Sequence, residues 1–422
     1  ASTGTPNYGG TATLAYAQEA ALDVTKDEWP TSGGPANVSV SGSATEVTLT
    51  ANRSLNDLTI TDGTFALSDD EVLTLSDGGL LINNGTFTAN NGTVVLSGNN
   101  TIGPNITLYN VDVDGGVSFD GPATNVAQIE NKLRMNPGSF VNGAPAYQQS
   151  STLIFQTENN QSDPYVLAQD SPWLRGSALA DYSQNAQRGV PSNVRITNNT
   201  FVELEAGSDG DFRDVKRDLT VDDGSGLLLD RETGGSNTNP TGVFVGNKWQ
   251  HNGTFDGGDN TDGGNQVIVG IFDNDRQGEN ESGLAGDLVI GSTGTFTQGH
   301  RSTDVRGNLT INGGYDFNTG VDQPLAVTGN LEIGSDGTLE LSDTVGGDLE
   351  LQGDWSNAGT FTANDRAVFF LGDSDQNIEN TSGLLDIPFV ILDKASDTDK
   401  VILNSEMQIS RRLTLTQGEL DT

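Results

Sequence analysis

Gly286-Asp-Leu288-Val-Ile290 is the stretch that decides the fold, because its pattern, Gly-x-Leu-x-Ile/Leu, recurs along the chain. The later copies are Gly307-Asn-Leu309-Thr-Ile311, Gly329-Asn-Leu331-Glu-Ile333 and Gly347-Asp-Leu349-Glu-Leu351. The glycines that start the four copies follow one another at nearly constant intervals. A repeat of roughly 20 residues is typical of a solenoid, in which each turn of the chain buries its apolar side chains against the next turn.

Short alternating segments fill the rest of the sequence. Helical periodicity is nearly absent, and runs such as residues 46–50 and 72–75 alternate polar and apolar side chains between Gly, Asn or Asp. This pattern indicates half-buried strands separated by turns. A second phrase, Gly-Thr-Phe, starts at Gly63, Gly85, Gly253, Gly294 and Gly359. We expect its phenylalanines to enter the core, where those of neighbouring turns would form a ladder of rings.

These patterns predict an all-β chain that forms a right-handed parallel β-helix or a closely related solenoid of up to roughly 20 turns. Tandem β-sandwich domains are the alternative, since they also consist of short strands. We expect four regions: an irregular lead-in or cap (1–35), solenoid rungs (36–119), rungs with long irregular loops or insertions (120–283), and rungs again (284–422). The last region ends inside a repeat-like phrase, so we expect the natural protein to continue beyond it.

The charge of the chain limits its partners. The sequence has 58 acidic and 20 basic residues, a formal net charge of −38. Such a surface repels nucleic acid and anionic membranes, and it leaves cations, neutral glycans and basic proteins as expected partners. The absence of cysteine excludes thiolate metal sites and thiol nucleophiles. No run of residues approaches the roughly 18 apolar residues of a membrane span, so we expect no direct membrane insertion.

Several segments carry a resemblance to known proteins. They are Ser151-Thr-Leu-Ile-Phe155, Gly189-Val-Pro-Ser-Asn-Val-Arg-Ile-Thr-Asn198 and the run from Gly353-Asp-Trp355 to Phe370. Over residues 55–422 the chain resembles long secreted surface proteins of the Bacteroidetes, in which similar phrases follow in the same order. The resemblance implies β-helix-like repeats, export by the type IX secretion route and an adhesin-like role at the cell surface. Residues 1–422 differ from the resemblance in that they contain no segment like the C-terminal sorting domain and carry extra polar residues at 156–190.

An acidic segment around Gly278 is the best metal candidate. Its carboxylates are those of Asp273, Asp275, Glu279 and Glu281. Alternating carboxylates around a glycine turn offer the oxygen ligands that Ca²⁺ requires, so we treat Ca²⁺ as the candidate cofactor. The spacing does not match an EF-hand loop, and a solvated acidic turn is the alternative interpretation. Two further acidic clusters follow the same reasoning: Asp256, Asp259 and Asp262, and Asp209, Asp211 and Asp214.

No constellation of catalytic residues stands out. Both histidines, His251 and His300, adjoin a Gly-Thr-Phe phrase, so we expect them on turns, and neither has the partners of a zinc site or a catalytic triad. Carboxylates are too numerous for one acid/base pair to be singled out. The four tryptophans, at 29, 173, 249 and 355, are candidates for stacking on sugars, but Trp249 and Trp355 occupy equivalent repeat positions, which favours the core. The sequence therefore predicts that the chain is not an enzyme.

The function expected from these features is a non-catalytic extracellular stalk or adhesin segment of a larger cell-surface protein. Its partners would be other surface proteins or neutral glycans, and the secretion machinery during export. Loops from residues 120–283 would present the binding surface, since regular rungs leave little room for variation. Two alternatives are a self-assembling filament subunit and a carbohydrate-binding or polysaccharide-degrading β-helix protein.

Overall fold

The computed structural model describes residues 6–25, 27–82, 84–122, 125–167, 171–174, 186–204, 211–229, 241–256, 266–271, 284–299 and 302–422. Within these ranges the regular secondary structure consists of β-strands, and no helix is present. Among the same residues, therefore, no helix has the length and hydrophobicity needed to cross a membrane. The prediction of an all-β chain is confirmed.

The first strands in chain order are β1 (Thr13–Tyr16), β2 (Ala21–Asp23), β3 (Asn37–Val40), β4 (Glu46–Leu49), β5 (Arg53–Ile60), β6 (Thr64–Leu67), β7 (Val72–Ile82), β8 (Thr86–Thr88), β9 (Thr93–Ser97), β10 (Asn99–Ile102), β11 (Thr107–Val113), β12 (Gly116–Phe119), β13 (Gln128–Met135), β14 (Phe140–Asn142), β15 (Ala146–Gln148), β16 (Thr152–Phe155), β17 (Tyr165–Leu167), β18 (Ala186–Arg188) and β19 (Asn193–Ile196). The remaining strands are β20 (Phe201–Leu204), β21 (Asp211–Val215), β22 (Asp218–Val221), β23 (Gly226–Leu229), β24 (Thr241–Val245), β25 (Lys248–His251), β26 (Thr254–Asp256), β27 (Gln266–Ile271), β28 (Leu284–Ala285), β29 (Asp287–Ile290), β30 (Thr295–Gln298), β31 (Thr303–Val305), β32 (Leu309–Ile311), β33 (Gly314–Phe317), β34 (Leu325–Val327), β35 (Leu331–Ile333), β36 (Thr338–Glu340), β37 (Leu349–Leu351), β38 (Trp355–Asn357), β39 (Thr360–Thr362), β40 (Ala367–Phe370), β41 (Gln376–Asn380), β42 (Leu385–Asp393), β43 (Lys400–Leu403), β44 (Met407–Gln417) and β45 (Glu419–Asp421).

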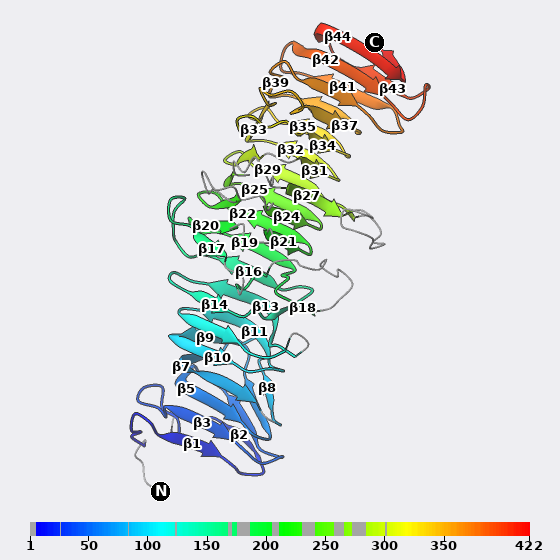
Figure 1. Ribbon diagram of the computed structural model, residues 1–422. Coiled ribbons are helices and arrows are strands. Elements are labelled where there is room, and N and C mark those ends of the chain that lie inside the picture. Colours follow the sequence, from blue (N-terminus) through cyan, green and yellow to red (C-terminus); the bar gives the residue numbers. More distant parts are fainter. Residues whose placement is uncertain are drawn as a thin grey trace. The chain divides into compact units, whose positions relative to one another are not determined.

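The chain divides into two compact units. Unit 1 comprises residues 1–158, 168–174 and 181–194, and unit 2 comprises residues 159–167, 175–180 and 195–422. Each unit is a stack of short parallel strands, as Figure 1 shows. Stacking of this kind is a β-solenoid, in which apolar side chains of successive turns bury one another.

Unit 1 begins with turns that alternate between two parallel sheets. β2, β4, β6 and β8 pair in that order in one sheet, and β1, β3, β5 and β7 pair in that order in the other. The pairing of the long strands β5 and β7 shifts its register between Leu55 and Asp57. β7 pairs with β9 through its first half and with β10 through its second half.

Unit 2 has three strands in each regular turn, and each belongs to a different parallel sheet. One sheet contains β29, β32, β35 and β38, a second contains β30, β33, β36 and β39, and a third contains β31, β34, β37 and β40. Parallel pairing between consecutive turns contradicts the alternative of tandem β-sandwiches, which are antiparallel. Antiparallel contacts among the described residues occur between β15 and β18, between β27 and β28, and at the isolated bridge between Asn160 and Asp163.

The recurring Gly-x-Leu-x-Ile phrase forms one column of unit 2. Leu288, Leu309 and Leu331 are in register on β29, β32 and β35, and all three point into the core. The fourth copy does not belong to this column, because Leu349 pairs with Leu325 of β34 in a different sheet. The next member of the column is instead Trp355, which pairs with Leu331. The last and shortest interval between the glycines of the phrase therefore separates two copies that lie in different sheets of the solenoid.

The phenylalanine ladder predicted from the Gly-Thr-Phe phrase is confirmed for four of the five phrases, whereas Phe361 of the fifth is half-buried and lies edge-on to Trp355. In unit 1 the rings of Phe65 and Phe87 stack with centroids 6.3 Å apart. In unit 2 Phe255 and Phe296 stack at 4.3 Å, and Tyr315 continues the stack 5.0 Å beyond Phe296. These rings fill the interior at successive turns, since large aromatic surfaces gain most from burial.

The solenoid has about 15 turns, fewer than the roughly 20 expected from the repeat length. Regular turns do match the repeat, because Leu288 and Leu309, which hold the same place in consecutive copies of the phrase, are in register. Other turns contain more residues, since Lys248 and Asp287 are in register although nearly two repeat lengths of sequence separate them.

Candidate functional site

The predicted calcium ligands cannot be placed. Asp273, Asp275, Glu279 and Glu281 lie outside the described residues. The two further acidic clusters are also incomplete, because residues 209, 259 and 262 fall outside the same ranges. Of the remaining members, Asp214 is buried in unit 2, with 3% of its surface exposed. Within the described part of the chain, no group of three or more His, Asp or Glu side chains is placed to hold a metal ion.

The tryptophans belong to the core. Trp29, Trp173 and Trp249 have no exposed surface and Trp355 has 1%, so none of them can stack on a sugar at the surface. His251 was expected on a turn, but it lies on β25 with no exposed surface, two residues after Trp249 and on the same side of the strand. His300 lies outside the described residues.

A polar surface on β11 and β13 of unit 1, and at the residue after β16, is an organised group of solvent-facing side chains among the described residues. The strands alternate: Val111, Val113, Leu133 and Met135 are buried, and the residues between them point outward. Parallel register places Asp112 beside Arg134 and Asn110 beside Lys132. In a parallel sheet, equivalent residues of successive strands lie about 4.8 Å apart, which allows direct contact between side chains. We call this surface the polar face.

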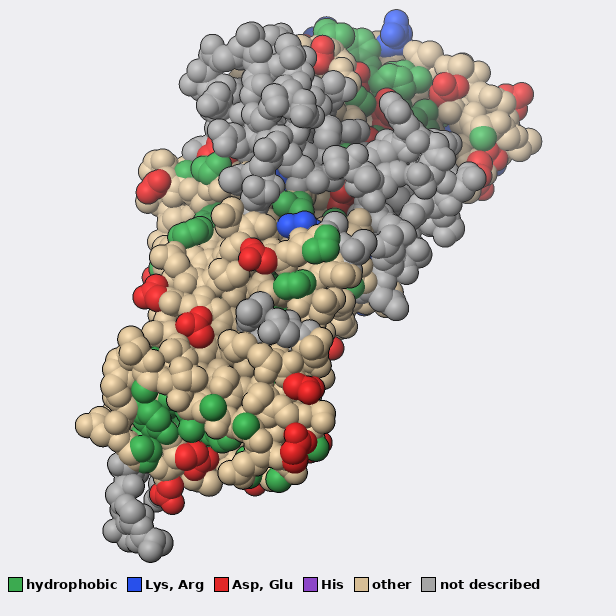
Figure 2. Space-filling view, turned by 60° about the horizontal axis from the view of Figure 1, so that its bottom comes forward, with side chains coloured by type: hydrophobic (Ala, Val, Ile, Leu, Met, Phe, Trp, Pro, Cys, Tyr) green, Lys and Arg blue, Asp and Glu red, His purple; other side chains and the backbone are tan. Residues whose placement is uncertain are grey.

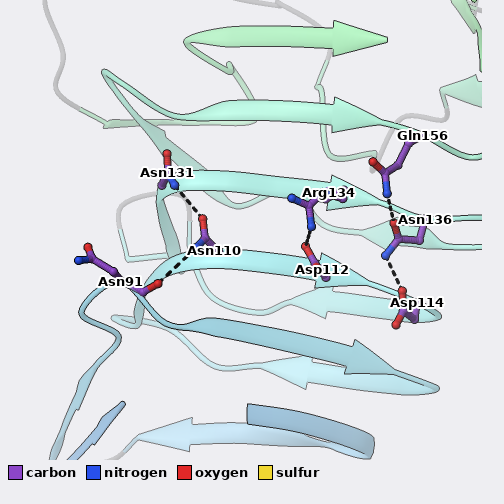
Figure 3. Close-up of polar contacts among 8 residues, drawn as sticks. All are labelled: Asn91, Asn110, Asp112, Asp114, Asn131, Arg134, Asn136 and Gln156. Atoms are coloured by element: carbon purple, nitrogen blue, oxygen red, sulfur yellow. Dashed lines mark hydrogen bonds and ion pairs between the residues drawn. The ribbon is translucent and has the colours of Figure 1, made fainter. Parts of the chain in front are cut away.

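Three rows of contacts cross the polar face (Figure 3). In the first row, Asn131 Nδ2 donates to Asn110 Oδ1 at 2.8 Å, and Asn110 Nδ2 donates to the backbone carbonyl of Asn91 at 3.4 Å. In the second row, Arg134 Nη1 lies 2.5 Å from Asp112 Oδ1. The third row is formed by Gln156, which donates to Asn136 at 2.6 Å, and by Asn136, which donates to Asp114.

The ion pair is the electrostatic centre of the polar face. The side chains of Arg134 and Asp112 are 30% and 22% exposed. Burial raises the pKa of Asp112, and the neighbouring Arg134 only partly opposes this rise. Asp112 therefore accepts a proton more readily than an exposed aspartate, and the pair weakens when it does.

Replacing Arg134 with glutamine should raise the pKa of Asp112 further, because the opposing positive charge is lost while the burial remains. An NMR titration of the Asp112 carboxyl measures the change. Arg195→Gln is the matched control, since Arg195 pairs with Asp222 rather than with Asp112. An unchanged Asp112 pKa in the Arg134→Gln variant would contradict the assignment of the pair.

The polar face offers hydrogen bonding without a reactive group. Amides, two carboxylates and a guanidinium are held in rows, so they present fixed donors and acceptors to a polar partner. Sequence reasoning did not single out these residues, although the interval from Asp112 to Arg134 equals that from Asp114 to Asn136. That shared interval, close to one turn, was the available signal.

The surrounding surface is acidic but dispersed. On the face that Figure 2 presents, Asp and Glu side chains are scattered and Lys and Arg side chains are few.

Comparisons with protein-family models, with curated proteins and with solved structures find no match to this chain.

Proposed function

We propose that the chain is a non-catalytic structural segment of an extracellular surface protein, an adhesin stalk exported by a type IX secretion route. The observation that carries the proposal is a ladder of side-chain hydrogen bonds that ties successive turns of unit 2 together between Asp287 and Asn377. This ladder runs beside the backbone pairing of the sheets. The resemblance to secreted surface proteins of the Bacteroidetes supports the location.

The ladder is built from Asp or Asn side chains at equivalent places in successive turns, and the first three of them follow the glycine of the repeated phrase. The backbone N–H of Asn308 donates to Asp287 Oδ1 at 2.7 Å, and that of Asn330 donates to Asn308 Oδ1 at 2.9 Å. The same contact links Asp354 to Asn330 at 2.9 Å and Asn377 to Asp354 at 2.8 Å. We call these five residues the Asx ladder.

The Asx ladder suits a structural role because each contact bridges two turns. A hydrogen bond of this kind contributes about 1 kcal/mol to stability, and the backbone bonds of the parallel strands act across the same interface. Separating two turns requires all of these bonds to break together. A stack held in this way should resist extension.

The polar face supplies a surface on which such a stalk can present contacts. Its rows of amides and one ion pair suit a neutral, hydrogen-bonding partner such as a glycan or the polar surface of another protein. The net charge of −38 disfavours nucleic acid and anionic membranes as partners. This supports the expected partners, which are other surface proteins or neutral glycans.

Removing two members of the Asx ladder tests the structural role. The double variant Asn308→Ala/Asn330→Ala should lose about 2 kcal/mol of stability and should yield at lower force, because two contacts between turns are lost. Single-molecule extension of the full chain measures the force, and chemical denaturation measures the stability. Asp336→Ala is the matched control, since Asp336 is an exposed turn residue outside the ladder.

Two outcomes would count against the stalk. One is extension of the unmodified chain without a measurable force peak, and the other is an equal force for the double variant and for Asp336→Ala. Location is tested separately by protease treatment and antibody labelling of intact producing cells. Protection of the chain inside the cells would contradict surface exposure.

A further inference from the structure

Lys394 is a buried lysine in unit 2, with only 2% of its surface exposed. It follows β42 directly and continues the inward side of that strand, since Leu392, two residues earlier, is also buried. Its Nζ donates to the backbone carbonyl of Leu371 at 2.6 Å and to Gln376 Oε1 at 2.7 Å. Gln376, at the start of β41, has no exposed surface. An amine and a carboxamide are therefore held together away from solvent.

The hydrogen bonds of Lys394 match those of a neutral amine. A neutral amine has two N–H groups and one lone pair, whereas an ammonium has three N–H groups and no lone pair. Lys394 donates two hydrogen bonds, and no carboxylate of a described residue lies within ion-pair distance of its Nζ. Burial lowers the pKa of Lys394, although the charge of Asp399 opposes the shift. A buried neutral amine with a free lone pair is a nucleophile.

The carboxamide of Gln376 is fixed beside this amine. Its Nε2 donates to the backbone carbonyl of Gly353 at 2.7 Å and to that of Leu351 at 3.2 Å. Because a C=O bond is about 1.2 Å long, a nitrogen at 2.7 Å from the oxygen lies about 3–4 Å from the carbonyl carbon. Reacting atoms in a near-attack arrangement are about 3–3.5 Å apart. Lys394 Nζ is thus within reach of the Cδ atom of Gln376.

A buried carboxylate oxygen belongs to the same part of unit 2. Asp399 Oδ2 is buried and has no hydrogen-bond partner among the described residues. Asp399 and Lys394 both border Gly418, since a Cβ atom there would lie 2.5 Å from Lys394 Cγ and 3.0 Å from the backbone oxygen of Asp399. Of the carboxylates whose charges act on Lys394, Asp399 has the strongest effect. An unpaired carboxylate oxygen can accept a proton and return it.

We propose that Lys394 and Gln376 form an isopeptide bond. The lone pair of Nζ attacks Cδ of Gln376, one proton passes from Nζ through Asp399 to Nε2, and the bond between Cδ and Nε2 breaks. The products are an amide that joins the two side chains and one molecule of ammonia. The step needs no oxidant or reductant, because it exchanges one amide for another.

The bond joins consecutive turns of unit 2. Gln376 on β41 is in register with Val401 on β43, and Lys394 lies between β42 and β43, in the later of the two turns. The Asx ladder ends at Asn377, directly after Gln376, so a covalent link would continue the ties between turns beyond the ladder. The inference goes beyond the proposed function and does not depend on it, since the chemistry requires only the folded unit.

Peptide mapping of the purified full chain, denatured after folding, tests the bond. In the unmodified chain trypsin cleaves after Lys394, which releases residues 367–394 and 395–400 as separate peptides. The bond consumes the amine that trypsin recognises, so we expect a single peptide, 367–400, lighter than its sequence by one ammonia, about 17 Da. Fragmentation should join Gln376 to Lys394, which distinguishes the bond from loss of ammonia at an asparagine. Release of both peptides at full mass would overturn the inference.

Substitutions test the parts played by the amine and by Asp399. Lys394→Met removes the nucleophile, so the loss of mass should disappear. Asp399→Asn should lower the cross-linked fraction at a fixed time by about tenfold or more, because the proton relay is lost. Asp399→Glu keeps a carboxylate and should restore the reaction. Asp397→Asn is the matched control, since it makes the same change at an exposed residue of the same turn.

Circular dichroism of each variant establishes that it is folded before the fractions are compared. Equal cross-linked fractions in Asp399→Asn and Asp397→Asn, or loss of the reaction in both Asp399 variants, would overturn the relay through Asp399. If Lys394→Met does not fold, mapping of the unmodified chain still decides whether the bond exists. A chain that resists extension without the bond contradicts this inference alone, and a cross-linked chain that extends without resistance contradicts the stalk alone.

Discussion

Replacing Gly329 with alanine should lower the free energy of unfolding of unit 2 by about 3 kcal/mol. A Cβ atom at this position would lie 2.4 Å from the backbone oxygen of Gly307 and 2.5 Å from its carbonyl carbon. The backbone N–H of Gly329 donates to that same oxygen at 2.8 Å, so the two turns cannot move apart without breaking the contact. Alanine also restricts the unfolded chain, but that gain is only about 0.4–1 kcal/mol and is outweighed by the clash.

Gly314→Ala is the matched control for this prediction. It makes the same change in the same unit, but its Cβ would meet only Thr338 Oγ1, at an ordinary distance of 3.6 Å. We expect a change within about 1 kcal/mol, of either sign. Chemical denaturation followed by circular dichroism measures both variants. Equal stability of the Gly329→Ala and Gly314→Ala proteins would show that the close approach of Gly329 to Gly307 does not determine the stability of unit 2.

A column of glycines, formed by Gly307, Gly329 and Gly353 in successive turns, explains how much of the fold could be predicted from the sequence. Gly307, Gly329 and Gly353 would each place a Cβ within 3 Å of the preceding turn, so glycine recurs once per turn wherever two turns approach this closely. The leucine two positions later is buried, which adds the apolar part of the phrase. Recurrence of both features was sufficient to predict a solenoid.

The assignment of each strand to a face could not be predicted in the same way. Gly347 also starts a Gly-x-Leu-x-Leu phrase, yet Leu349 belongs to the sheet of β34 and β40. A tight turn followed by an inward leucine is a local requirement, and any of the three sheets can satisfy it. Trp355 continues the column of Leu331 although it is not a leucine, because only an inward apolar side chain is needed there.

The candidate sites show the same division between local and long-range information. Asp112 and Arg134 look like ordinary outward residues of two separate strands, and only the parallel register brings them together. Lys394 looks like a surface residue in the sequence, yet it occupies an inward position, two residues after the buried Leu392. Burial of a charged side chain depends on the turns that surround it, so a single sequence does not reveal it.

His251 provides the second large effect, through pH. It packs among Trp249, Phe255 and Phe296, with its ring centroid 5.8 Å from those of Trp249 and Phe296, and its Nε2 lies 3.1 Å from the carbonyl oxygen of Thr295. Burial lowers the pKa of His251 to about 4, although the contact with the Thr295 carbonyl opposes the shift. The folded chain therefore holds this imidazole neutral.

Lowering the pH from 7 to 4 should cost unit 2 about 3 kcal/mol through His251 alone. The unfolded chain takes up a proton at this residue once the pH falls below about 6.5, whereas the folded chain does so only near pH 4. The contribution of the neutral imidazole to the free energy of unfolding is thus fully present above pH 6.5, declines as the pH falls, and is lost below pH 4. The measurement is the free energy of unfolding at several pH values, by chemical denaturation.

His251→Phe isolates this contribution from that of the 58 carboxylates. Phenylalanine fits an aromatic cluster and cannot titrate, while the acidic residues remain the same in both proteins, so their effect cancels in the difference. We expect the unmodified chain to lose about 3 kcal/mol more than the variant between pH 7 and pH 4, and the two curves to run parallel above pH 7. Parallel stability curves of the two proteins over the whole pH range would mean that His251 reaches solvent in the folded state, which would contradict its burial in the core.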